Sequence, residues 1–267
     1  MLDATALERL LKRDRAITAL GLAAIASLSW SYTILVASMS SGDMAGAASQ
    51  MAMPQDQPWS GVDFLLMFAM WMVMMVAMML PSAAPMILLF ASANRKRQHP
   101  QAPYLHLHTL LFASSYVVVW AGFAVIAALA NWALQSRGFM TSMMGSALPL
   151  WGGGLLIAAG LYQFTPLKFA CLNKCRSPLA FLMSEWREGR LGTFVMGLRH
   201  GMYCVLCCWA LMALLFVLGV MNLAWIALLA TFVLIEKLAT SGPWFSRASG
   251  LLLIGWGAWM VGSAFPR

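Results

Sequence analysis

The sequence predicts an all-α protein: a polytopic bundle of about seven transmembrane helices, with the N-terminus inside and the C-terminus outside. Two compositional observations lead there. Hydrophobic residues make up 61% of the 267 residues, and charged residues only 10%, whereas soluble domains carry roughly 25% charged residues. The apolar residues also gather in stretches long enough to cross a bilayer, which takes roughly 20 residues. We therefore expect a single integral membrane domain spanning 1–267, with the lipid bilayer as its first partner.

The predicted helices follow the apolar stretches in order. The first stretch is about 23 residues long, which exceeds the 7–15 residues usual in the core of a signal peptide and favours a retained helix. The second contains Pro81 and Pro85, and proline removes a backbone donor, so we expect a broken segment there. The seven stretches are about 16–38, 62–91, 109–133, 147–165, 197–218, 222–240 and 249–265.

The basic residues predict the orientation. If the N-terminus is cytoplasmic, fifteen of the seventeen Lys and Arg residues lie on the cytoplasmic side, and only Arg137 and Arg267 lie on the outer side. Lys and Arg concentrate in cytoplasmic loops of membrane proteins. This pattern makes 165–196 a basic cytoplasmic loop. The segment 39–61, which has no basic residue, becomes a Met-rich outer loop.

Several function classes find no support. The net charge of +8 lies in short loops between apolar stretches and forms no nucleic-acid-binding module. No G-x₄-G-K-[ST] motif is present, which argues against an ATP-driven pump. Acidic residues are few and scattered, so no Ser–His–Asp arrangement can be built and we do not expect an enzyme.

All five cysteines lie within one stretch of 38 residues, and three of them share the fifth predicted helix with a histidine. At 100° per residue, His200, Cys204 and Cys207 fall within about 60° of one helix face, and Cys208 widens that arc to about 100°. Thiolates and imidazole suit copper(I), with zinc as the alternative. Packing alone is the competing interpretation, because cysteine is a common small residue in helix interfaces.

Two further groups of side chains are expected at the cytoplasmic end of the bundle, near His200. Cys171 and Cys175 are spaced C-x₃-C, which puts both sulfurs on one face if the segment is helical, and neighbouring basic residues favour their thiolates. Counting back from the short turn at 219–222 places Glu236 near the depth of Cys204. Its carboxylate could orient His200, bind a proton or pair with a neighbouring cation, and ionisable groups in a membrane segment are candidates for function. The predicted metal ligands are Cys171, Cys175, His200, Cys204, Cys207, Cys208 and Glu236.

The chain also has 22 methionines. Methionine packs well in irregular helix interfaces, which is how we interpret the methionines of the second stretch, and it is also a thioether ligand for copper(I). The outer loop has no comparable packing need. There we expect a metal-capture segment formed by Met39, Met44, Met51 and Met53.

Four stretches resemble the bacterial predicted metal-binding integral membrane proteins, a family named for a domain of unknown function. They are AMMLPSAAPMI at 77–87, YQFTPLKFACLNKCRSPLAFL at 162–182, WREGRLGTFVMGLRHGMYCVLCCWALM at 186–212 and GVMNLAWIALLATFVLIEK at 219–237. The resemblance implies metal binding by the cysteines and His200, in a multi-pass protein of the bacterial inner membrane. Val205–Leu206 departs from the pattern, which has a glycine before the CCW motif.

Three functions follow as hypotheses. The first is a membrane protein that binds a soft metal ion, copper(I), for transport or for delivery to a metallochaperone or a membrane-complex partner. The second is a thiol–disulfide redox protein, and the third is a structural or assembly subunit of a membrane complex. The cysteines favour the first two, and helices rich in small residues also suit the third.

Overall fold

The computed structural model describes residues 4–40, 60–97, 105–138, 149–238 and 243–264, and these contain helices and no strand. The predicted all-α class is therefore confirmed for the described part of the chain. The helices are α1 (Ala4–Ser40), α3 (Gly61–Arg97), α4 (Leu105–Ser136), α5 (Pro149–Tyr162), α6 (Pro166–Arg176), α7 (Pro178–Glu185), α8 (Gly189–Ala213), α9 (Leu215–Leu218), α10 (Leu223–Leu238) and α11 (Trp244–Ser263).

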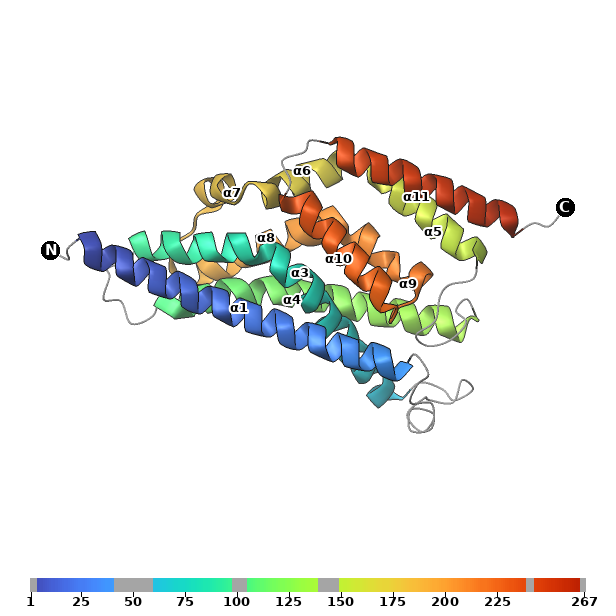
Figure 1. Ribbon diagram of the computed structural model, residues 1–267, viewed down its shortest axis with the longest axis horizontal. Helices are drawn as coiled ribbons and strands as arrows, with labels where there is room; N and C mark the ends of the chain where they lie inside the picture. Colours follow the sequence, from blue (N-terminus) through green and yellow to red (C-terminus); the bar gives the residue numbers. More distant parts are fainter. Residues whose placement is uncertain (1–3, 41–59, 98–104, 139–148, 239–242, 265–267) are drawn as a thin grey trace.

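The long helices run lengthwise through the molecule. Four described segments are long and apolar enough to cross a membrane, namely those in α1, α3, α4 and the combined α8–α9. α5 and α6 make a further candidate span, bent by 66° at the break between them. The start of α1 and the end of α11 lie at opposite ends of the long axis (Figure 1). A count of seven spans remains a prediction, because α10, with 16 residues, and α11 are not among the described segments found long and apolar enough to cross a membrane.

α3 differs from the expected broken segment. Pro81 and Pro85 lie inside one continuous helix, and Figure 1 shows that helix changing direction near its middle. A proline removes the hydrogen bond to the carbonyl four residues earlier, so side-chain contacts near the bend help to hold such a helix. The Met79 carbonyl accepts from the Ser82 hydroxyl at 2.8 Å and from the Tyr116 hydroxyl of α4 at 3.2 Å. The Tyr116 bond holds the bent region of α3 against α4.

The segment 165–196 is largely helical where a basic loop was expected. Pro166 and Pro178 start α6 and α7, in the first-turn position where proline costs no hydrogen bond. Thr165 caps α6 by accepting from the Lys168 backbone N–H at 3.3 Å. α6 then packs against α8. This packing brings the cysteines of the two helices together.

α4 and α8 approach closely because of a glycine. A Cβ atom on Gly197 would lie 1.9 Å from the Ser115 hydroxyl oxygen and 2.4 Å from the Phe112 carbonyl oxygen. Only glycine therefore fits at this crossing. The close approach sets the position of α4 beside the cysteines of α8.

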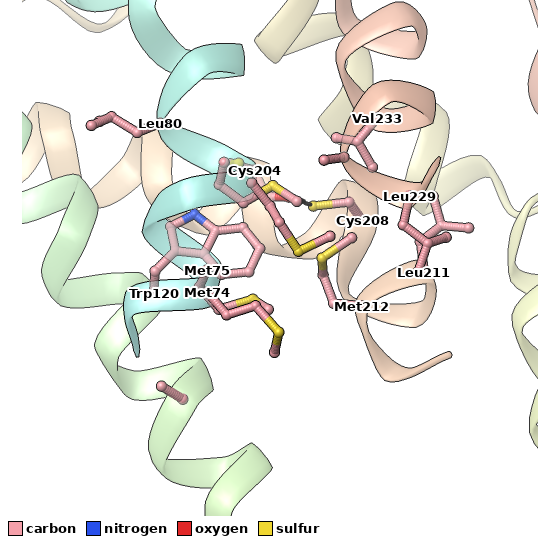
Figure 2. Packing of buried hydrophobic residues seen from close by; sticks show 14 of the residues in the cluster. Met74, Met75, Leu80, Trp120, Cys204, Cys208, Leu211, Met212, Leu229 and Val233 are labelled. Carbon is pink, nitrogen blue, oxygen red and sulfur yellow. Dashed lines mark hydrogen bonds between the residues drawn. The ribbon is translucent and has the colours of Figure 1, made fainter. Parts of the chain in front are cut away.

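The core lies between α3, α4, α8 and α10 and is rich in sulfur. The methionines of α3 turn inward in Figure 2, where Met74 and Met75 lie near Cys204, Cys208 and Met212. Flexible thioethers fill the irregular space that a bent helix leaves, in agreement with their interpretation as packing residues. The buried methionines of α3 are Met67, Met70, Met74, Met75, Met78, Met79 and Met86.

Candidate metal centre

The cysteine face of α8 points into the protein. His200, Cys204, Cys207 and Cys208 are all buried, between 0% and 3% exposed. The helix places them there because residues three and four apart share a face. The two later thiols bond within the helix, where Cys207 and Cys208 donate to the Cys204 carbonyl at 3.1 and 2.9 Å. The predicted face of α8 with the histidine and the three cysteines thus forms one side of the core.

Cys204 has the most polar surroundings of these residues. The Lys237 ammonium donates to the Cys204 sulfur at 2.9 Å and to the Ser82 hydroxyl at 3.0 Å. The Tyr116 hydroxyl lies 3.0 Å from the same sulfur. A buried ammonium needs an anionic or strongly accepting partner. The sulfur of Cys204 fills that role, and a cation already stands beside it.

Cys208 lies against a thioether. Its sulfur is 3.9 Å from the Met79 sulfur, across the interface between α8 and α3. Met75 and Met212 belong to the same buried cluster (Figure 2). Thiol and thioether sulfurs from two helices therefore face one another close to Cys204. Such donors select soft ions, copper(I) above all.

α6 adds a second pair of thiols. Cys175 and the buried Cys171 both lie within electrostatic range of Cys207. Both α6 cysteines therefore lie near Cys207, on the buried face of α8. All five cysteines are free thiols.

His200 sits in an aromatic box. Its ring stacks on Phe112 and Tyr116, with centroids 6.1 and 5.6 Å away, and meets the edge of Phe181 at 5.4 Å. The buried Nδ1 atom has no hydrogen-bond partner among the described residues. An unpartnered buried nitrogen is costly and calls for an explanation, such as a ligand or a water. It is one turn of α8 from Cys204.

Glu236 is already engaged. Its carboxylate forms an ion pair with the Lys168 ammonium of α6 at 2.7 Å and accepts from the Ser246 hydroxyl at 2.5 Å. Lys168 also donates to the Gln163 side chain. Both charged side chains are buried, 0% and 1% exposed. In this arrangement Glu236 joins α10 to α6 and α11 and faces Lys168, away from Cys204.

The donors fit a soft ion better than a hard one. Among the described residues no three His, Cys, Asp or Glu side chains meet in a way that would hold a metal by themselves. A centre here with more than two ligands would draw on methionine, a thioether that suits copper(I) better than zinc. The sequence pattern did not single out Met79, Tyr116 or Lys237 as neighbours of the thiols. Only the helical repeat of Met72, Met75 and Met79 could have suggested the first.

The expected outer capture segment is mostly outside the described residues. Met44, Met51 and Met53 belong to 41–59, which the structure does not describe. Met39 lies in the last turn of α1 and is half-buried. Its role as a capture residue stays a prediction.

Comparison with known proteins agrees with this donor set. A family model described as PpoB2, copper chaperone, matches residues 68–260, which is most of the chain and includes every element around the sulfur cluster. No curated protein and no solved structure matches. The copper association expected from the cysteines is thus confirmed at the level of the family, while the bacterial and membrane parts of the expectation stay predictions. The chain belongs to the PpoB2 family of copper chaperones.

Proposed function

We propose that this protein is a membrane-embedded chaperone that binds one copper(I) ion at Cys204, Cys208 and Met79 and delivers it to a protein partner. The observation that carries the proposal is the meeting of two thiols and a thioether in the core. Cys208 lies 3.9 Å from the Met79 sulfur, and Cys204 already has a cation 2.9 Å away. Copper(I) is a soft cation, and these are its preferred ligands.

Three features support a membrane location. Four described segments are long and apolar enough to cross a bilayer. Large apolar side chains are exposed along several helices, among them Leu20, Leu28, Leu110 and Leu252 at 65–75%. The end of α3 and the start of α8 carry the basic residues expected at a cytoplasmic surface. The bacterial inner membrane is the compartment that we propose.

Delivery fits the buried position better than storage at a surface. Copper at Cys204 would be shielded from water and from other thiols, and its release would need a partner or an opening of the bundle. Lys237 would balance the charge of a second thiolate around the ion, because a buried uncompensated charge is strongly unfavourable. Transport across the membrane remains compatible with this site and is not needed for delivery.

Copper(I) titration of the purified protein tests the proposal. In detergent and without oxygen, competition with a chromophoric copper(I) chelator should give about one tightly held ion per chain. Cys204→Ser with Cys208→Ser should remove it. Met79→Leu should weaken binding about tenfold, whereas Met70→Leu should not. Met70 is buried on the same helix, roughly 13 Å further along the axis.

Three results would count against this copper site. Unchanged binding in the double cysteine variant would place copper elsewhere. Equal losses in the Met79 and Met70 variants would point to a general packing effect. Tighter binding of zinc than of copper(I) would contradict the soft-ion assignment.

A redox function is the second candidate, and the electrostatic proximity of the free thiols Cys175 and Cys207 favours it. If these thiols cycle, rapid thiol trapping in membranes followed by mass spectrometry should find a disulfide joining them. If both stay reduced under copper-replete and copper-depleted growth, the redox candidate fails.

A further inference from the structure

A cavity of about 270 Å³ opens where the end of α3, the start of α4 and the start of α8 come together. Arg97 and Arg187 line it and are exposed, whereas His108 and Thr193 line it and are buried. The cavity therefore combines cationic side chains open to solvent with a buried imidazole. It lies outside the sulfur cluster described above.

The hydrogen bonds fix which nitrogen of His108 is free. The Thr193 hydroxyl donates to the Gly189 carbonyl at 3.0 Å, so its oxygen must accept from His108 Nδ1, 3.0 Å away. The lone pair of the His108 ring therefore lies on Nε2, the nitrogen that does not contact Thr193. A histidine whose other ring nitrogen is anchored in this way is the usual form of a metal ligand.

The same helix leads from the cavity to the thiols. Thr193, Met196, His200 and Cys204 follow one another at spacings of three and four residues on the buried face of α8. Met196 adjoins the cavity wall, since its sulfur accepts from the Arg187 backbone N–H at 3.2 Å. His200, with its unpartnered Nδ1, is roughly 10 Å beyond Thr193 along the helix axis. Met196, His200 and Cys204, whose side chains suit a soft ion, thus lie along this face of α8.

The charge at the entrance selects the form in which copper arrives. The Arg97 guanidinium is held over the Trp186 ring at 4.4 Å, a favourable cation–π contact. With Arg187 it outweighs the single carboxylate of Glu188 that also lines the cavity. A bare copper(I) cation would be repelled here. A copper(I) ion held by two thiolates carries a net negative charge and would be attracted.

We infer that this cavity receives copper(I) as an anionic complex with a small thiol and passes the ion through His108 and His200 to Cys204. The inference rests on the proposed copper site. The transfer is ligand exchange without a change of oxidation state. A bond forms from copper to His108 Nε2 as one thiolate leaves, and the second thiolate leaves when the ion is taken up further along α8. The arginines hold the complex at the entrance, and the departing thiolates go to solvent, where they take up the protons that Cys204 and Cys208 lose when they bind copper.

Loading rates test the inference. The full-length protein in detergent is mixed with copper(I) glutathione, an anionic complex, or with tetrakis(acetonitrile)copper(I), a cationic one, and protein-bound copper is measured at timed intervals. Arg97→Gln with Arg187→Gln should slow loading from the anionic complex at least about tenfold. Loading from the cationic complex should not slow, and the final copper content should equal that of the wild type. Lys96→Gln is the matched control, since this exposed cation neighbours Arg97 without lining the cavity.

A second variant separates steering from ligation. His108→Gln should slow loading from both complexes and leave the final copper content unchanged. Equal slowing by Lys96→Gln, equal effects of the arginine variant on both complexes, or wild-type loading by the His108 variant would each overturn the inference. A wild-type protein that binds no copper would instead refute the proposed function itself. The final copper content thus distinguishes the two failures.

Discussion

Glu236 and Lys237 are adjacent on α10, equally buried and opposite in charge, yet their surroundings have little in common. Glu236 is closed in by polar partners, the Lys168 ammonium at 2.7 Å and the Ser246 hydroxyl at 2.5 Å. Lys237 reaches the Cys204 sulfur and the Ser82 hydroxyl. Glu236 completes an ion pair between helices. Lys237 instead donates to a sulfur that can bind a metal.

The difference shows how one helix can serve stability and chemistry at the same time. A buried ion pair is rigid and leaves neither charge free to bind a ligand. The Glu236 carboxylate therefore stabilises the packing of α10 against α6 and α11. A buried ammonium beside a thiol is less complete, because the sulfur keeps lone pairs that can bind a metal while the ammonium stays nearby as a counter-charge. The chemistry of the core is therefore expected on the Lys237 side of α10, and variants of the two residues should separate into different phenotypes.

The largest expected effect is on the ion pair. Glu236→Gln would leave the Lys168 ammonium buried without its counter-charge, which costs about 3–5 kcal/mol of stability. Thermal unfolding in detergent should show the loss. Copper bound per folded chain should stay at the wild-type level, because Cys204 and Cys208 keep their neighbours.

A double variant checks that interpretation. Replacing both charges, with Lys168→Met and Glu236→Met, should restore most of the stability, since well-packed apolar pairs often match buried ion pairs. If copper binding disappears in the Gln variant while the protein stays folded, Glu236 is a ligand after all. The structural reading of the pair would then be wrong.

An intermediate effect is expected from Gly197→Ala. This change should move α4, which contacts Cys204 on the Lys237 side of α10, and should leave the Glu236 ion pair in place. The new Cβ would meet the Ser115 side chain and the Phe112 backbone, and overpacking of this kind costs about 1–3 kcal/mol. Tyr116 would move away from Cys204, and copper affinity should fall. Gly154→Ala is the control, because nothing lies within 4 Å of its added Cβ. Equal effects of the two variants would show that the crossing of α4 and α8 does not position the site.

The sequence predicted the local features of this molecule better than the contacts between helices. Apolar length and helical repeat were enough to find the long helices and the shared face of His200, Cys204 and Cys207, because both depend on residues near one another in the chain. They could not say whether Glu236 or Lys237 turns toward Cys204. That depends on how α10 is rotated against α8, and adjacent residues on a helix differ by about 100°.

The basic segment before α8 shows the same limit. Its lysines and arginines suggested a basic cytoplasmic loop, yet Lys168 is fully buried because Glu236 neutralises it from another helix. Prolines likewise suggested a break in α3, but the Tyr116 hydroxyl of α4 bonds to the Met79 carbonyl beside the bend. In both cases a partner distant in sequence reverses the local expectation. A single sequence does not identify such partners.

The smallest expected effect on stability comes from Lys237→Met, which tests the other half of the comparison. Removing the ammonium leaves Cys204 free to become a neutral thiol, so the protein should lose no more than about 1–2 kcal/mol. Copper(I) affinity should fall about tenfold, because a metal bound by two buried thiolates would lack its balancing charge. Chelator competition measures this loss, and Lys174→Met, a cation on α6 away from these sulfurs, should leave affinity unchanged. Tighter copper binding by the Lys237 variant would mean that the ammonium competes with copper for Cys204, and the charge-balancing role would have to be abandoned.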